Sequence, residues 1–432
     1  MSTVDEPVGP EIPPEELSEE AARKAELAVP ASLVAGSASE YLRSSLTRIR
    51  AGEAGVLPVI GGLIVVSILF QSLNSHFLTA QNLVNLLIQA AVFALLGMGE
   101  VFVLLLGEID LSVGYVAGMG AVIMADAAGP AHGWPWYAAI AVALLACAGI
   151  GLIQGLIITQ IGLPSFVVTL AGLLFWQGVM LKILGNGGTI PINDTVINDI
   201  ASNNLSNAAS WVVMLVIVGA FAVLAWRRDA KRRAAGLVAP PPTITLLKIA
   251  IAAAAGVGLV ILCTVNRGII EPISGVPWVV LLVLGVLGVW SFLLGRTQIG
   301  RYVYAIGGNA EAARRAGISV SAIRTLAFTL TGLTAGIAGV VYASRLRSIS
   351  TTLDGGTLVL YAVAAAVIGG TSLMGGRGQA LHGVLGGIVI AAIYNGMGLM
   401  GYGAAAQYMV TALVLLAAVT IDATTHRGRT TT

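Results

Sequence analysis

The stretch from Leu294 to Thr325 combines five arginines, a capping asparagine and a carboxylate in one short hydrophilic segment between two apolar ones. Asn309 can accept a hydrogen bond from the free amides of a short helix running from Ala310 to Ala316, with Glu311 near its positive end. Gly317 then suits the end of that helix. A short stiff helix held between two membrane spans can act as a lever, because a partner docked on it moves the spans. The alternative is an ordinary basic surface loop.

A second segment, residues 97–118, carries three carboxylates, Glu100, Glu108 and Asp110. An acidic side chain at the bilayer centre costs about 2.5–3.5 kcal/mol, so Glu100 should face protein or water rather than lipid. On one helix, Glu100 and Glu108 would lie about 12 Å apart along the axis and could line one wall of a cavity. The GEIDLSVG sequence at 107–114 could instead break the helix there. Glu108 and Asp110 could also only cap the helix that begins near Leu111.

Three uncharged polar side chains, Asn85, Gln89 and Asn395, fall inside other apolar segments. Such residues more often bond neighbouring helices, but they are also candidates for the wall of a polar path, together with the three carboxylates. The four histidines are scattered, and both cysteines, Cys147 and Cys263, lie in apolar segments. We therefore expect no metal site and no disulfide frame. No HExxH or GxxxxGK[ST] motif occurs, so we expect neither an enzyme active site nor a phosphate loop.

The composition requires a membrane environment for these elements. Of 432 residues, 57% are hydrophobic and 10% are charged, and the mean hydropathy is +0.90. A soluble domain has about a quarter charged residues. The sequence therefore predicts an all-α polytopic membrane protein. About 20 apolar residues are needed to cross the hydrocarbon, and we identify twelve candidate spans, at roughly 56–73, 83–106, 111–128, 138–160, 165–184, 210–226, 246–265, 278–295, 325–343, 358–373, 380–400 and 406–421.

The positions of the basic residues set the orientation. With the N-terminus inside, 19 of the 23 lysines and arginines fall on inner segments. Only Lys182, Arg267, Arg345 and Arg347 remain outside. This bias predicts that both termini are cytoplasmic. The inner segments then include the five arginines of the opening stretch, Arg296, Arg301, Arg314, Arg315 and Arg324.

The chain divides into a tail, a membrane domain and a short end. Residues 1–55 are rich in Glu and Pro over much of their length, so we expect a disordered cytoplasmic tail. The membrane domain covers 56–426, with a large inner loop at 296–324, and residues 427–432 form a C-terminal tail. The GGTSLMGG sequence at 369–376 shares three glycine and leucine positions with GEIDLSVG at 107–114, which indicates a weak internal repeat. Either segment could be re-entrant.

Four motifs in this order resemble the ribose- and xylose-type sugar permeases of bacterial ABC importers. They are GEIDLSVG at 107–114, GRYVYAIGGNAEAARRAGI at 300–318, AAAVIGGTSLMGGRG at 364–378 and QYMVTALVLLAAVTIDATT at 407–425. The resemblance covers the chain from about residue 56 to 426. The acidic GEIDLSVG and the additional hydrophobic pair around 210–265 are most similar to the xylose subgroup, whereas the long N-terminal tail departs from it. Glu311, Ala312, Ala313 and Gly317 match the EAA-x-x-x-G pattern that such permeases present to their ATPase subunit.

The resemblance implies a transport subunit rather than an enzyme, in the plasma membrane of a bacterium. The permease would be a homodimer or pseudo-dimer in contact with lipid, would bind no cofactor itself, and would carry a monosaccharide such as the pentose xylose. ATP would be bound by separate ATPase subunits on the cytoplasmic side. A sugar-binding protein would dock outside, near 185–209 and 344–357, and no nucleic acid partner is expected. The implied ATPase-coupling residues are Asn309, Glu311, Ala312, Ala313, Arg314, Arg315 and Gly317.

Three other functions remain open from the residues alone. An ABC permease for branched-chain amino acids would favour groups that bind an α-carboxylate and an amine. A proton-coupled secondary sugar transporter would act without an ATPase and would need a second buried titratable group at the depth of Glu100, which the sequence does not show. A structural scaffold would not need Glu100 within an apolar helix.

Overall fold

The computed structural model describes residues 56–237, 239–268 and 272–427. The predicted N-terminal tail at 1–55 lies outside the described residues, and so does the predicted C-terminal tail at 427–432 except for Arg427. The described residues divide into two compact units, one within 211–258 and the other within 56–210 and 259–427. Each unit is described by itself.

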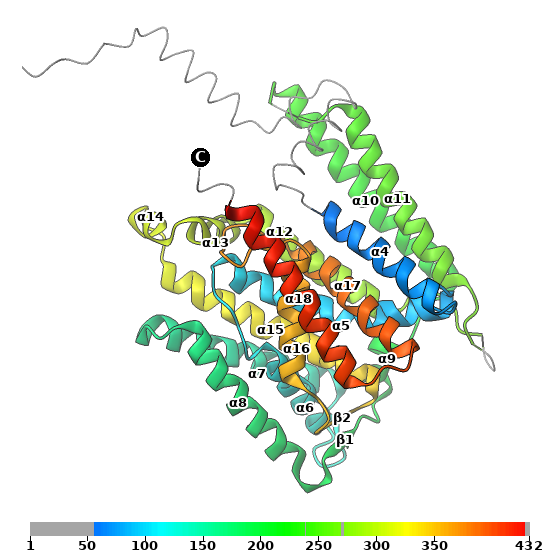
Figure 1. Cartoon of the computed structure of the whole chain (residues 1–432), viewed down its shortest axis with the longest axis vertical. Coiled ribbons are helices and arrows are strands. Elements are labelled where there is room, and N and C mark those ends of the chain that lie inside the picture. The colour runs from blue at the N-terminus through cyan, green and yellow to red at the C-terminus, as the bar shows by residue number, and fades with distance from the viewer. Residues whose placement is uncertain (1–55, 238, 269–271, 428–432) are drawn as a thin grey trace, which may run out of the picture. The chain divides into compact units, whose positions relative to one another are not determined.

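The described chain is mostly helical (Figure 1). The elements up to residue 234 are α4 (Leu57–Leu73), α5 (Ala80–Leu105), α6 (Val113–Ala128), α7 (Trp136–Leu156), the π-helical turn η1 (Ile157–Ile161), α8 (Ser165–Leu184), the 3₁₀ turn η2 (Gly185–Gly187), β1 (Thr189–Pro191), α9 (Thr195–Ser202) and α10 (Asn207–Ala234). The remainder are α11 (Pro242–Thr264), α12 (Trp278–Arg296), α13 (Gln298–Gly308), α14 (Ala310–Arg315), α15 (Val320–Leu346), β2 (Ser348–Ser350), α16 (Gly355–Ile368), α17 (Ala380–Leu399) and α18 (Ala404–Arg427).

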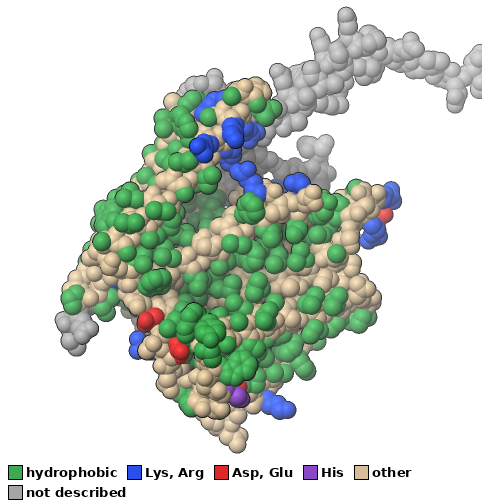
Figure 2. Space-filling model, turned by 180° about the vertical axis from the view of Figure 1, so that it is seen from behind, with side chains coloured by type: hydrophobic (Ala, Val, Ile, Leu, Met, Phe, Trp, Pro, Cys, Tyr) green, Lys and Arg blue, Asp and Glu red, His purple; other side chains and the backbone are tan. Residues whose placement is uncertain are grey.

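Eight helical stretches among the described residues are long and apolar enough to cross a membrane. They are α5, α7 with η1, α8 with η2, α10, α11, α12, α15 and α17. Shorter apolar helices, α4, α6, α16 and the first part of α18, coincide with the other predicted spans. Figure 2 shows apolar side chains spread over a broad outer surface, as helices in contact with lipid require. The structure thus agrees with a polytopic membrane protein, whereas twelve crossings and cytoplasmic termini remain predictions.

The larger unit is built around α5, which is buried along nearly its whole length. It packs against α15, α16 and α17 (Figure 1). Small residues allow the close approach: a Cβ on Gly387 of α17 would lie 2.6 Å from the backbone nitrogen of Ala94 in α5. In the same way, a Cβ on Gly332 of α15 would lie 2.4 Å from the carbonyl oxygen of Cys147 in α7. At these two positions, glycine allows neighbouring helices to pack closely.

A small antiparallel sheet closes one end of this unit. Strands β1 and β2 pair with Ile190 opposite Ile349, so the segments 185–209 and 344–357 lie together. The sequence predicted neither this sheet nor α9, because both lie in a polar stretch without clear periodicity. Because α15 runs from the residues after α14 to the residues before β2, the sheet and α14 lie at opposite ends of the unit (Figure 1).

The smaller unit, as far as it is described, is a hairpin of two apolar helices, α10 and α11. Asp229 in α10 is almost completely buried. Its carboxylate accepts hydrogen bonds from Nε of Arg228 at 2.8 Å and from Oγ1 of Thr245 at 3.0 Å. This hairpin is the additional hydrophobic pair predicted around 210–265. The hydrogen bonds fix the register of the two helices near their basic connection.

The predicted orientation can be tested by cysteine labelling. Ser202 in α9 and Ala235 after α10 are both exposed, and the native Cys147 and Cys263 are buried. We expect Ser202→Cys to react with a membrane-impermeant maleimide in intact cells, and Ala235→Cys to react only after permeabilisation. The unsubstituted chain is the control and should stay unlabelled. The reverse pattern would contradict the predicted topology.

Candidate functional site

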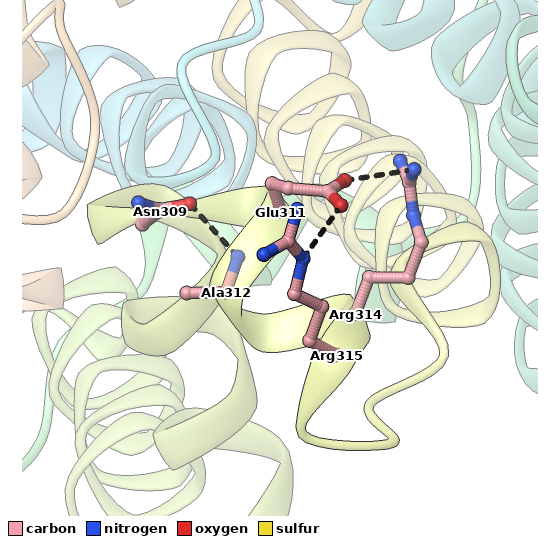
Figure 3. A network of polar contacts seen from close by, with 5 residues as sticks. All are labelled: Asn309, Glu311, Ala312, Arg314 and Arg315. Carbon is pink, nitrogen blue, oxygen red and sulfur yellow. Dashed lines mark hydrogen bonds and ion pairs between the residues drawn. The ribbon is translucent and has the colours of Figure 1, made fainter. Parts of the chain in front are cut away.

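The segment predicted to act as a lever folds as two short helices, α13 and α14. The Oδ1 atom of Asn309 accepts a hydrogen bond from the N–H of Ala312 at 2.9 Å and caps α14 (Figure 3). The helix ends at Arg315, and Gly317 follows with a φ of +83°, a conformation that favours glycine. The capped helix and its glycine stop are confirmed to within one residue.

The charged side chains of α14 bond to one another at its surface. Glu311 accepts hydrogen bonds from Nη1 of Arg314 at 3.0 Å and from Nε of Arg315 at 3.1 Å (Figure 3). All three are exposed, so each pair contributes only about 0.3–0.5 kcal/mol to stability. Ala313 is the one residue of α14 that is buried, and Ala312 is exposed. The helix therefore packs on Ala313 and leaves the rest of its surface exposed.

The helix that precedes α14 is fastened to two loops that were predicted as an internal repeat. The hydroxyl of Tyr304 donates a hydrogen bond to the carbonyl of Gly378 at 2.7 Å. Burial raises the pKa of Tyr304, so this donor stays protonated. The N–H of Gly376 donates to the carbonyl of Leu105 at 2.8 Å. A Cβ on Gly307 would lie 1.9 Å from that carbonyl oxygen and 2.6 Å from the nitrogen of Gly376. We call Leu105, Gly307 and Gly376 the glycine junction.

Glu108 lies beside the coupling region but not on the helix of Glu100. The chain leaves α5 after Leu105, and Gly107 adopts a φ of +75°. The helical spacing predicted for the two glutamates is therefore wrong, and the GEIDLSVG segment breaks the helix as the alternative required. The carboxylate of Glu108 instead pairs with Arg324 of α15 at 3.2 Å. This ion pair borders a pocket of ≈ 560 Å³ that Arg314 of α14 also lines.

Glu100 and Asp110 organise the turn between α5 and α6. Glu100 is completely buried, and its Oε1 accepts a hydrogen bond from the N–H of Asp110 at 3.1 Å. Asp110 in turn accepts from the N–H and the hydroxyl of Ser112, at 2.8 and 2.6 Å. Ser112, and not Asp110, occupies the N-cap position of α6. Oε2 of Glu100 has no partner within the described chain, and a role of either carboxylate in a solute path stays a prediction.

Substitutions of Glu100 test how much its hydrogen bond to Asp110 contributes to stability. Leucine removes the acceptor for the Asp110 amide and leaves that amide buried, so we expect Glu100→Leu to lower the free energy of unfolding by about 1–3 kcal/mol. Glutamine keeps an acceptor oxygen, so Glu100→Gln should unfold close to the wild type. Thermal unfolding in detergent measures both. Equal stability of all three proteins would show that the hydrogen bond to Asp110 contributes nothing.

The three uncharged polar candidates have different surroundings. Oδ1 of Asn395 in α17 accepts a hydrogen bond from Asn82 of α5 at 2.8 Å, which joins these two helices. Asn85 is exposed. Gln89 is buried, and its Oε1 has no hydrogen-bond donor among the described residues. Among the three, Gln89 is therefore the one with an unused buried polar atom.

The structure also assembles residues that the sequence did not single out. Phe93, Tyr361 and Tyr394 from three helices stack edge to face, and Arg345, in the last turn of α15, interacts electrostatically with Tyr394. These residues are far apart in the chain and share no motif, so no sequence signal joined them. Arg345 was recognisable only as one of four basic residues on the predicted outer side.

Comparison with known proteins places the whole membrane region in a family. A family model described as "Branched-chain amino acid transport system / permease component" matches residues 82–419. The chain is 36% identical over 375 residues to the xylose transport system permease protein XylH of Escherichia coli strain K12, which covers 86% of this chain and 92% of that protein.

Two further relatives from the same strain carry the names of other sugars. The ribose import permease protein RbsC is 29% identical over 363 residues, with 83% of this chain and 91% of that protein covered. The D-allose transport system permease protein AlsC is 28% identical over 361 residues, covering 83% and 89% respectively. No solved structure matches the chain.

Proposed function

This chain belongs to the family of permease components described for branched-chain amino acid transport systems, and from that premise we propose that it is the permease subunit of a bacterial ABC importer for a monosaccharide, with xylose as the first candidate. The identity to XylH over most of both chains carries this proposal. Although the family description mentions amino acids, the relatives compared above are named for sugars. The chain is then a transport subunit and not an enzyme.

The geometry supports a coupling role for α14. Two ATPase subunits that close on binding ATP would pull on the exposed surface of α14. The helix α13 would move with α14, because Asn309 directly connects the end of α13 to the start of α14. The glycine junction would pass this movement to the inner ends of α5 and α16, which lead into the two repeat loops. Arg324 follows α14 in the chain, so its ion pair with Glu108 joins the loop after α5 to the same movement.

The remaining partners follow from the same proposal. A sugar-binding protein would deliver its cargo at the end where β1 and β2 pair, since that end lies opposite α14. A second permease copy would complete the path, with lipid around the exposed apolar side chains. The assembly would lie in the bacterial inner membrane. ATP would be bound by the ATPase subunits alone.

Uptake by the complete transporter tests the function. The permease is co-expressed with its neighbouring ATPase and binding-protein genes and reconstituted in vesicles with ATP inside. We expect uptake of labelled xylose that stops when the ATP is replaced by a non-hydrolysable analogue. Uptake of leucine or valine but of no monosaccharide would contradict the sugar assignment. Titration of the binding protein alone with pentoses and hexoses measures its affinity for each sugar and identifies the cargo independently.

A further inference from the structure

An aromatic cluster lies where α5, α16 and α17 meet. The ring of Phe93 is 5.1 Å from that of Tyr361 and 6.0 Å from that of Tyr394, and the two tyrosine rings are 6.3 Å apart. All three pairs are close to edge-to-face, with interplanar angles of 74°, 68° and 73°. Phe93 and Tyr361 are buried, whereas Tyr394 is half-buried. The rings thus form a rigid apolar base with one tyrosine at its accessible edge.

Arg345 of α15 brings a positive charge to this base. It lies close enough to Tyr342 and Tyr394 to interact electrostatically with both. The side chain is half-buried, and within the described chain it forms no hydrogen bond or ion pair. A guanidinium has five N–H donors in a fixed planar arrangement. Arg345 lies in the last turn of α15, beside the predicted outer surface, so these donors can bond an acceptor that comes from outside the chain.

Gln89 adds an unused acceptor. It lies four residues before Phe93 in α5, so the two side chains share one face of the helix. Gln89 is 7% exposed, and its Oε1 has no hydrogen-bond donor among the described residues. Gln89 is thus joined to the aromatic cluster through Phe93, and Arg345 through Tyr394. Hydrogen-bond donors, an acceptor and aromatic rings are the mixture that a polyhydroxylated ring needs.

The neighbouring carboxylate favours a neutral ligand over an amino acid. An amino acid would need an acid for its ammonium group as well as Arg345 for its carboxylate. Asp354 interacts electrostatically with Tyr342 and Tyr361, but it already accepts hydrogen bonds from Thr357 and from the hydroxyl of Tyr408. Burial tends to raise the pKa of Asp354, and these hydrogen bonds outweigh it and lower the pKa overall. The carboxylate is thus engaged at the start of α16.

We infer that Gln89, Phe93, Tyr342, Arg345 and Tyr394 form a subsite that receives the sugar from the outer side and contributes to its selection. This inference rests on the proposed function and specifies where the cargo first contacts the permease. The position agrees with that role, since α15 continues from Arg345 into the outer sheet. The rings would stack on the pyranose, and Arg345, Gln89 and the hydroxyl of Tyr394 would bond its hydroxyl groups.

Uptake by the complete transporter in vesicles tests the subsite, with saturating sugar-loaded binding protein so that capture is not limiting. We expect Arg345→Gln and Tyr394→Leu to lower xylose uptake about tenfold or more, the effect of losing one charged hydrogen bond or a stacked ring. ATP hydrolysis stimulated by the loaded binding protein should persist, because α14 is unchanged. Lys182→Gln is the control, since Lys182 is an exposed basic residue near the end of α8, on the predicted outer side but outside the segments 185–209 and 344–357, and should transport like the wild type.

The ratio of xylose to ribose uptake within one preparation does not depend on how much protein folds. We expect Tyr394→Phe and Arg345→Lys to change this ratio about threefold or more, because each alters one hydrogen bond to the sugar. If Tyr394→Phe and Arg345→Lys reduce the uptake of both sugars equally, the subsite is overturned. It is also overturned if Arg345→Gln leaves xylose uptake unchanged. Absence of any monosaccharide uptake by the wild-type complex would instead overturn the proposed function.

Discussion

Replacing Gly307 with alanine is expected to abolish sugar uptake by the assembled transporter. The added Cβ would lie 1.9 Å from the carbonyl oxygen of Leu105, a distance that no packed carbon can occupy. The end of α13 must then move away from the loop that contains Gly376. Overpacking of this kind costs about 1–3 kcal/mol, so the helices should still form while the link from α14 to α5 and α16 is broken.

Gly308 provides a matched control one residue away. A Cβ there would meet no atom within 4 Å, and alanine in place of glycine favours the helix by about 0.5–1 kcal/mol. Gly308→Ala should therefore transport as well as the wild type. The measurement is vesicle uptake, with detergent-solubilised yield and thermal unfolding as measures of folding. Normal uptake by Gly307→Ala would show that the glycine junction does not transmit movement.

Charge reversal at Glu311 is expected to uncouple the ATPase from transport. The two ion pairs of Glu311 are exposed and contribute little to folding, so Glu311→Lys should change the free energy of unfolding by no more than about 0.5 kcal/mol per pair. It would, however, place three positive charges together on the surface offered to the partner. We expect uptake to fall about tenfold or more, as for a misplaced charge at an interface, while the ATPase subunits keep their basal hydrolysis.

Lys231→Glu is the comparison for this effect. Lys231 is exposed near the end of α10, which is also predicted to be cytoplasmic, but it is not part of α14. Its reversal should leave uptake unchanged. If Glu311→Lys transports normally, or if both variants lose uptake equally, the surface of α14 is not the coupling contact.

The coupling helix was predictable because its signals are local. An asparagine cap and a glycine stop act within nine residues, and each behaves as the sequence predicts. The membrane helices were predictable for a similar reason, since a long apolar run has few alternatives to a helix in lipid. The break at Gly107 was foreseen only as an alternative, because a positive φ cannot be told from ordinary glycine packing in a glycine-rich chain.

The features that could not be predicted from the sequence depend on contacts between segments that are distant in the chain. Glu100 could not be assigned to the Asp110 amide because that bond needs the turn after α5 to fold back onto the helix. Strands β1 and β2 lie about 160 residues apart in the chain and are three residues long, too short to show a period of two. Arg345 and Tyr394 come from different helices, α15 and α17, so their proximity is a property of helix packing and not of any motif.

The central claim is that this chain forms a sugar path that is driven from the cytoplasmic side by a separate ATPase. Xylose accumulation in vesicles should therefore be measured with the purified chain alone, under a proton gradient, and with the complete transporter supplied with ATP. The account predicts no accumulation by the chain alone and ATP-dependent accumulation by the complex. Accumulation against a gradient by the chain alone would contradict it.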